Sequence, residues 1–175
     1  MTAMVNLLHA HPHIFIDSKL TIVFDEKGLA GIKVNWFFDK MYSAILIEDY
    51  DKNSNGKLDA PEIEKMKQYA FKAIKGYNYF TFIIIDKKSY PVKKVKKFSA
   101  EKFSNRIIYE FFIPCQVKAK RSFQEIKIAM YDETYYTDIS FYKKAPVRLV
   151  NDELFECSYK LRKNWKGNLK KHQRG

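Results

Sequence analysis

The stretch DKNSNGKLDAPE, residues 51–62, constrains the fold more than any other part of this sequence. A calcium loop of the EF-hand type needs oxygen ligands at positions 1, 3, 5, 7, 9 and 12, and a Gly at position 6 for the sharp turn. The stretch meets every requirement, with Gly56 at the turn. We therefore expect a helix–loop–helix around Ca²⁺. The predicted ligands are Asp51, Asn53, Asn55, the backbone carbonyl of Lys57, Asp59 and Glu62.

The same residues predict where the second helix begins. Asp59 can cap it, Pro61 falls in its first turn, and Glu62 completes an Asp-x-x-Glu capping box. Asn at positions 3 and 5 lowers the ligand charge, which predicts a weak site of roughly 0.1 to 1 mM that fills only outside the cytosol. Sensor EF-hands open a Met-rich groove, usually as a pair, and the sequence has no second loop. We therefore expect structural calcium rather than a calcium switch.

Alternating apolar and polar residues on both sides of this loop predict β-strands. The segments 13–25 and 29–38 flank DEKG and are typical of a hairpin, and Ile63, Met66, Ala70 and Ile74 form one helical stripe before Gly76. The expected fold class is α+β: a mostly antiparallel, sandwich-like β framework with an inserted EF-hand at about residues 38–76. Further strands are expected in 77–86, 90–98, 105–113, 123–132, 135–142, 147–150 and 155–161, with one helical turn in SAEKF, residues 99–103.

The chain is expected to form one domain over residues 11–161. Residues 1–10, MTAMVNLLHA, resemble the last part of a signal peptide, preceded by a few residues that were added in cloning. The alternative is an ordinary frayed N-terminus. Residues 162–175 are basic and predict a flexible tail. Cys115 and Cys157 would pair in an oxidising compartment or stay as two free thiols, and the sequence leaves both open.

A histidine cluster, HAHPH, precedes the first predicted strand and includes His9, His11 and His13. Residues two apart in a strand point to the same side, so these imidazoles can converge on one ion, with Asp17 as a further oxygen ligand. Imidazole suits Ni²⁺, Co²⁺, Zn²⁺ and Cu²⁺. The cluster predicts a transition-metal site of His11, His13 and Asp17, and the alternative is that His13 only packs at the start of the strand.

The net charge of +12 predicts surfaces that attract anions, such as an anionic membrane or the acidic loops of a transporter. Nucleic-acid binding is not favoured, because the lysines of PVKKVKKF alternate with apolar residues as on a solvated sheet face. Catalysis is not favoured either. His172 is the only histidine outside the N-terminal cluster, and no nucleophile lies in a catalytic motif such as GxSxG. The expectation is a binding protein, not an enzyme.

Three stretches together resemble a bacterial family of unknown function, domain of unknown function 1007: AHPHIFID, NWFFDKMYSAILIEDYD and YDETYYTDISF. His11, His13 and Asp17 match its first motif. The resemblance implies an exported, periplasmic component of an ABC-type transport system, encoded beside or fused to nickel/cobalt permeases. It therefore implies a metal-handling accessory protein whose partner is a membrane permease; the alternative is a calcium-stabilised module that binds protein or ligand without a transition metal. Its late motif, with no role assigned, matches Asp132, Tyr135, Tyr136 and Asp138.

Overall fold

A computed structural model gives the structure of the protein and describes residues 13–162. The predicted signal remnant, His9, His11 and the tail from residue 163 onward lie outside the described residues. Arg162, the first residue of the predicted tail, is exposed and belongs to no helix or strand.

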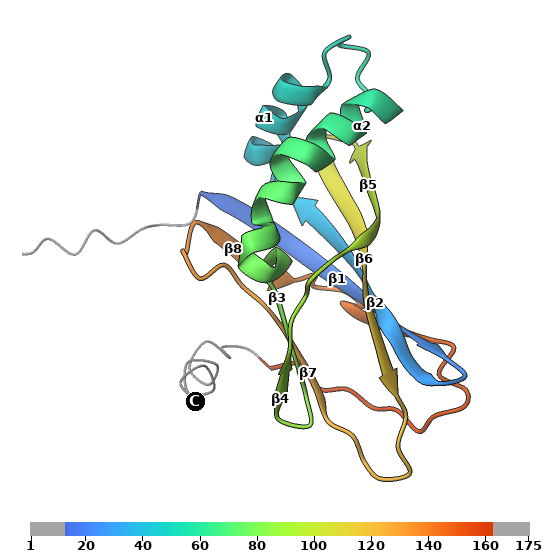
Figure 1. The fold of residues 1–175 in the computed structure, drawn as a ribbon. Helices are drawn as coiled ribbons and strands as arrows, with labels where there is room; N and C mark the ends of the chain where they lie inside the picture. Colours follow the sequence, from blue (N-terminus) through green and yellow to red (C-terminus); the bar gives the residue numbers. More distant parts are fainter. Residues whose placement is uncertain (1–12, 163–175) are drawn as a thin grey trace, which may run out of the picture.

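A mixed six-stranded sheet forms the framework of the molecule (Figure 1). Its strand order is β5-β6-β2-β1-β8, and β9 also pairs with β1. The predicted hairpin of the first two strands is confirmed, and the pairings of β2 with β6 and of β6 with β5 are antiparallel too. The pairings of β1 with β8 and with β9 are parallel. The strands are β1 (Ile14–Asp25), β2 (Gly28–Phe38), β5 (Lys96–Phe103), β6 (Arg106–Lys118), β8 (Thr137–Phe141) and β9 (Val147–Val150).

Two helices flank the 51–59 loop, which forms the tip of the molecule (Figure 1). Helix α1 (Lys40–Tyr50) begins at Asp39, whose Oδ1 accepts the backbone N–H groups of Met41 and Tyr42. The buried Ser43 docks this helix on β6, because its Oγ accepts the backbone N–H of Ile107 at 2.9 Å. A hydroxyl thus satisfies a buried N–H that would otherwise be left without a partner.

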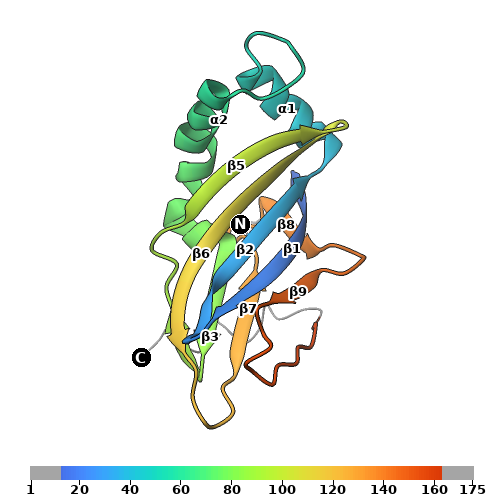
Figure 2. The same cartoon turned by 90° about the vertical axis from the view of Figure 1, so that its right-hand side faces the viewer.

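Helix α2 (Ala60–Met66) begins at Asp59 with the predicted capping box. It continues as a π-helical turn, η1 (Lys67–Phe71), and a 3₁₀ segment, η2 (Lys72–Phe80). We call residues 60–80 the helical arm. The arm lies along one face of the six-stranded sheet (Figures 1 and 2). The predicted stripe does face the core: Met66 is fully buried, and Ile63, Ala70 and Ile74 pack against the buried cluster.

A small antiparallel sheet follows the arm on the same side of the large sheet (Figure 2). Its order is β4-β3-β7, so that β3 is its centre. The strands are β3 (Thr81–Ile85), β4 (Lys88–Tyr90) and β7 (Ile126–Met130). The second layer is therefore made of the helical arm at one end and this short sheet at the other.

Aromatic side chains fill the space between the two layers. Trp36 on β2 is 1% exposed, and its ring meets the ring of Phe111 edge-on, with centroids 4.9 Å apart. Phe111 also packs on Phe71 of the helical arm at 4.9 Å. Edge-to-face and tilted contacts of this kind add to the free energy gained by burying the rings.

The structure corrects several local predictions. Residues 77–80, expected to begin a strand, end the helical arm, and residues 91–95, expected within a strand, form the link between β4 and β5. Residues 99–103, expected to form a helical turn, belong to β5, because they pair with β6. Residues 155–161, expected to form a strand, make no strand pairing. Both cysteines are free thiols; Cys115 is buried, which raises its pKa to about 12, and Cys157 is exposed.

Candidate functional site

The first half of the 51–62 loop is folded around its own side-chain oxygens. Asp51 accepts the backbone N–H of Asn55 at 3.1 Å with one carboxylate oxygen and that of Gly56 at 3.0 Å with the other. Asn53 Oδ1 also accepts the N–H of Asn55, and Asn55 Oδ1 accepts that of Lys57. Gly56 has a φ of +77°, a conformation that residues with a Cβ rarely adopt. The oxygens expected at positions 1, 3 and 5 therefore all turn toward the loop backbone.

Glu62 closes the loop by reaching back to its beginning. Its Oε1 accepts the backbone N–H of Lys52 at 2.9 Å, and its Oε2 accepts that of Asp59 at 3.0 Å. Asp59 Oδ1 in turn accepts the N–H of Glu62 at 3.1 Å. The side chain that starts the helical arm thus also ties the two ends of the loop together.

These contacts keep Glu62 ionised. The N–H groups of Asp59, Lys52 and Asn53, and the charge of Lys65, hold the pKa of the Glu62 carboxyl below its usual value, against the opposing effect of burial. A lowered pKa means that the carboxylate favours folding above the ordinary Glu pKa, and that this contribution is lost as the pH falls through the folded-state value.

The donor set of the loop fits Ca²⁺, which prefers carboxylate, amide and carbonyl oxygens. Within residues 13–162, however, no three His, Cys, Asp or Glu side chains lie close enough together to hold a metal ion. The carboxylates instead accept backbone N–H groups. Each such oxygen keeps a second lone pair, and Asn and backbone oxygens supply the remaining ligands. Asp51, Asn53, Asn55, Asp59, Glu62 and the carbonyl of Lys57 are therefore the groups that would hold a Ca²⁺ ion in this loop.

The structure does not bring His13 and Asp17 together. His13 is exposed, its backbone N–H donates to the carbonyl of Tyr136 at 2.9 Å, and its ring lies 5.1 Å from the ring of Tyr136. Asp17 lies four residues further along the strand, about 13 Å away at the usual strand rise. Its carboxylate is bound to Arg106 at 3.0 Å. Asp17 therefore acts as the partner of an arginine.

The late motif is held together by one buried carboxylate. Asp132 is 4% exposed; its Oδ1 accepts the N–H and the hydroxyl of Thr134, and its Oδ2 accepts the N–H of Thr137 at 3.0 Å. This turn leads directly into β8. Tyr135 and Tyr136 are exposed on the turn, whereas Asp138 lies on β8 and is half-buried.

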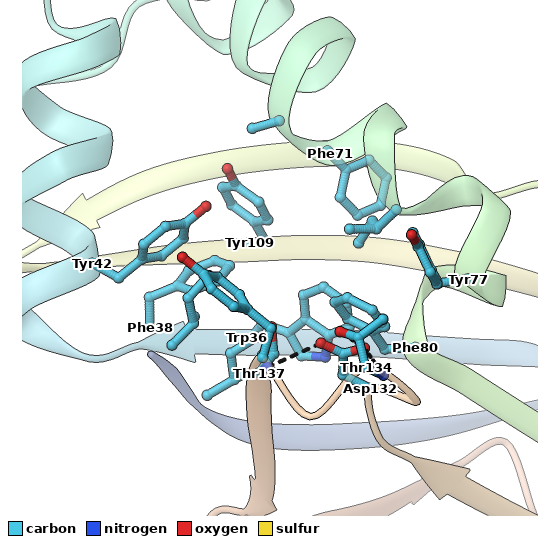
Figure 3. A pocket seen from close by; sticks show the side chains of 15 residues that line it. Trp36, Phe38, Tyr42, Phe71, Tyr77, Phe80, Tyr109, Asp132, Thr134 and Thr137 are labelled. Atoms are coloured by element: carbon cyan, nitrogen blue, oxygen red, sulfur yellow. Dashed lines mark hydrogen bonds between the residues drawn. The ribbon is translucent and has the colours of Figure 1, made fainter. Parts of the chain in front are cut away.

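A cavity of about 240 Å³ lies between the helical arm and the large sheet, beside the turn of Asp132 (Figure 3). Its walls are mainly aromatic and come from β1, β2, α1, the arm, β6 and the turn into β8. The aromatic wall residues are Trp36, Phe38, Tyr42, Phe71, Tyr77, Phe80, Tyr109 and Tyr136. The sequence gave no sign of this space, because contacts between distant strands are invisible in a local pattern.

The fold and loop define a class: an α+β domain with a mixed sheet, a small antiparallel sheet and two helices around an oxygen-rich loop. The chain belongs to the family described as "Protein of unknown function (DUF1007)", whose model matches residues 1–171. The resemblance inferred from the three motifs is confirmed at that level.

Two relatives show the extent of similarity. An uncharacterized 15.5 kDa protein in the trpE 3′ region of Spirochaeta aurantia is 34% identical over 104 residues, which cover 59% of this chain and 74% of the relative. An uncharacterized protein of Haemophilus influenzae is 26% identical over 141 residues, which cover 79% of this chain and 66% of the relative. No solved structure matches the chain.

Proposed function

We propose that this chain is an exported, periplasmic accessory protein of a metal transport system, with one structural Ca²⁺ in the 51–62 loop. The periplasmic location and the transporter partner, a membrane permease or an ABC-type transporter, rest on what the family resemblance implies. The basic composition supports docking on an anionic membrane or on acidic loops of that transporter. Within residues 13–162, no helix is long and apolar enough to cross a membrane.

One observation supports the calcium part most directly: the side chain of Glu62 spans the loop from Asp59 to Lys52. In an EF-hand this residue supplies the bidentate carboxylate. Here it also completes the capping box of helix α2, so an ion bound in the loop would fix the start of the helical arm relative to α1. The role that follows for Ca²⁺ is to stabilise the arm rather than to signal.

Glu62→Gln tests the calcium site. We expect the wild type to bind one Ca²⁺ and to melt at a higher temperature with Ca²⁺ than with a chelator, because an ion that binds only the folded state stabilises it. Glu62→Gln removes a ligand charge and should weaken Ca²⁺ binding on the order of a hundredfold. Calorimetric titration and thermal melting measure both effects.

Glu64→Gln is the matched control. Glu64 lies two residues further along α2, is exposed and pairs with Lys67. This variant should keep the calcium affinity of the wild type. Equal calcium binding by the Glu62→Gln variant and the wild type, or a melting temperature that Ca²⁺ leaves unchanged, would contradict the calcium site.

The transition-metal part of the proposal assigns Ni²⁺, Co²⁺, Zn²⁺ or Cu²⁺ to His11 and His13. Its support is the position of His13, which is exposed and held in place by the backbone of Tyr136. Asp17 is left out of this ligand set because Arg106 holds its carboxylate. His13 would therefore supply one imidazole from a backbone that is held in place, and His11 would supply the second.

The double variant His11→Ala/His13→Ala tests this assignment. We expect it to lose calorimetric binding of all four metals, because the two imidazoles are the proposed ligands. His172→Ala, made in the otherwise unchanged wild-type chain, serves as the control and should bind as the wild type does. Retention of metal binding by the double variant would remove the assignment to His11 and His13. Absence of metal binding by the wild type would favour the alternative function, a calcium-stabilised ligand-binding module, for which the aromatic cavity is the supporting observation.

A further inference from the structure

The loop between β6 and β7, residues 119–125, carries the most exposed large apolar side chain in the described part of the chain. This side chain is Phe123, which is 89% exposed. The loop forms one end of the molecule, and the 51–59 loop forms the other end (Figures 1 and 2). Single exposed apolar side chains are common and mean little alone. What distinguishes Phe123 is its place at a protruding end and the charges around it.

The hairpin of β3 and β4 holds this loop in place. Asp86, at the turn of the hairpin, accepts hydrogen bonds from Lys120 Nζ at 2.6 Å and from the backbone N–H of Glu125 at 3.1 Å. The carbonyl of Glu125 in turn accepts the backbone N–H of Asp86 at 2.9 Å. Phe123 therefore lies on a loop that is anchored on both sides and sits beside Lys87 and Lys88.

Four exposed cations lie on the same loop and hairpin or directly beside them. Within the described residues, none of them forms an ion pair. We call these cations together with Phe123 the basic tip. Its members are Lys87, Lys88, Lys118, Arg121 and Phe123.

The acidic residues of the loop and the hairpin are already neutralised. Asp86 pairs with Lys120 at 2.6 Å, and Glu125 pairs with Lys127 at 2.9 Å. The turn of β1 and β2, residues 25–28, is hydrogen-bonded to the start of the loop and adds two acids and one lysine. This end of the molecule therefore keeps an excess of positive charge.

The part of the chain that includes the basic tip also carries the excess charge of the whole protein. Residues 65–127 hold sixteen of its 32 Lys and Arg but only four of its 20 Asp and Glu. Four exposed lysines lie in residues 93–97, which lead from β4 into β5. Such an uneven charge distribution turns a protein so that its basic part approaches an anionic surface first.

We infer that the basic tip docks the protein on a membrane that contains anionic phospholipids, with Phe123 inserted among the headgroups. A protruding ring among free cations suits a fluid interface, in which lipid phosphates attract the cations and the acyl boundary receives the ring. Docking of this kind places the 51–59 loop at the end away from the membrane (Figure 1). The inference rests on the docking role in the proposed function, and it names the surface and the lipid partner.

Sedimentation of the full chain with vesicles, without added metal ions, tests the inference. We expect the wild type to bind vesicles of phosphatidylglycerol mixed with phosphatidylcholine, and to bind vesicles of phosphatidylcholine alone much less. Binding should fall as salt rises, because salt screens the attraction between the cations and the lipid.

Phe123→Ser tests the inserted ring. This variant should bind the phosphatidylglycerol vesicles about tenfold more weakly, because the ring no longer leaves water. Phe103→Ser is the matched control, since Phe103 is 71% exposed at the end of β5 that lies near the helices (Figure 2). The control should bind as the wild type does.

Lys87→Gln/Arg121→Gln tests the cations and should weaken vesicle binding on the order of twentyfold. Lys143→Gln/Lys144→Gln removes the same charge from exposed positions after β8, and its effect should stay below about threefold. A difference between the two variants separates docking by the tip from attraction by net charge alone.

Phe123→Trp, made together with Trp165→Phe, reports insertion directly. Its fluorescence should shift to shorter wavelength when phosphatidylglycerol vesicles are added, because the new indole enters an apolar interface. Trp36 is 1% exposed and does not meet the lipid. Phe103→Trp in the same background should show no shift.

Four results would overturn the inference: no binding of the wild type to phosphatidylglycerol vesicles, equal losses in the tip variants and their controls, no fluorescence shift of the Phe123→Trp variant, or binding only to polyglutamate. The last result would indicate an acidic protein partner instead. Calcium and transition-metal titrations need no vesicles, so failure of the proposed metal sites is distinguishable from failure of the docking.

Discussion

Phe111→Ala is expected to lower the free energy of unfolding by about 4 kcal/mol, as large-to-small changes at fully buried aromatic positions do. Phe111 is fully buried on β6 and contacts Trp36 of β2 and Phe71 of the helical arm. Its loss would leave a hole between the two layers. Because single domains are stable by only about 5 to 15 kcal/mol, this variant should unfold at a much lower denaturant concentration.

Urea unfolding measures the effect, with calcium present throughout. Phe123→Ala provides the comparison, since Phe123 is 89% exposed and should change stability by less than about 0.5 kcal/mol. Similar losses in the two variants would show that Phe111 is not at the centre of the packing.

Asp132→Ala is expected to destabilise the protein by about 3 kcal/mol, because the buried N–H of Thr137 would lose its acceptor and the turn would lose two further hydrogen bonds to Thr134. Chemical unfolding gives the free-energy change, and Asp132→Asn, which keeps one acceptor oxygen, should lose less.

Asp138→Ala is the matched control from the same motif. Within residues 13–162 its carboxylate makes no hydrogen bond or ion pair, so the change should cost less than about 0.5 kcal/mol. If Asp138→Ala proved as costly as Asp132→Ala, the motif would not depend on the single carboxylate that we describe.

Local rules predicted the parts of this fold that local contacts decide. The hairpin of β1 and β2 and the reciprocal cap of Asp59 and Glu62 each depend on residues close in sequence. The sequence of residues 51–62 also predicted the oxygen-rich loop. The loop folds around its own side chains, and its role as a Ca²⁺ site stays a proposal.

Features that depend on distant partners could not be predicted in this way. SAEKF was predicted as a helical turn because Ala, Glu and Lys favour helices, but pairing with β6 places it in β5. Residues 155–161 alternate like a strand, yet they have no pairing partner. The cavity needs β2, β6 and the helical arm together, so it could be found only in the assembled fold.

The parallel pairing of β8 and β9 with β1 has a consequence for contacts between separate copies of the chain. β1 is a long strand, and its outer side would present unpaired N–H and C=O groups to any other strand. β8 occupies this side from Ile14 to Ser18, and β9 occupies it from Leu20 to Val23. The opposite edge of the sheet is β5, which carries lysines, a common protection against strand addition. Two short strands from late in the chain thus cover the open hydrogen-bonding side of β1, where another copy of the chain could otherwise add a strand.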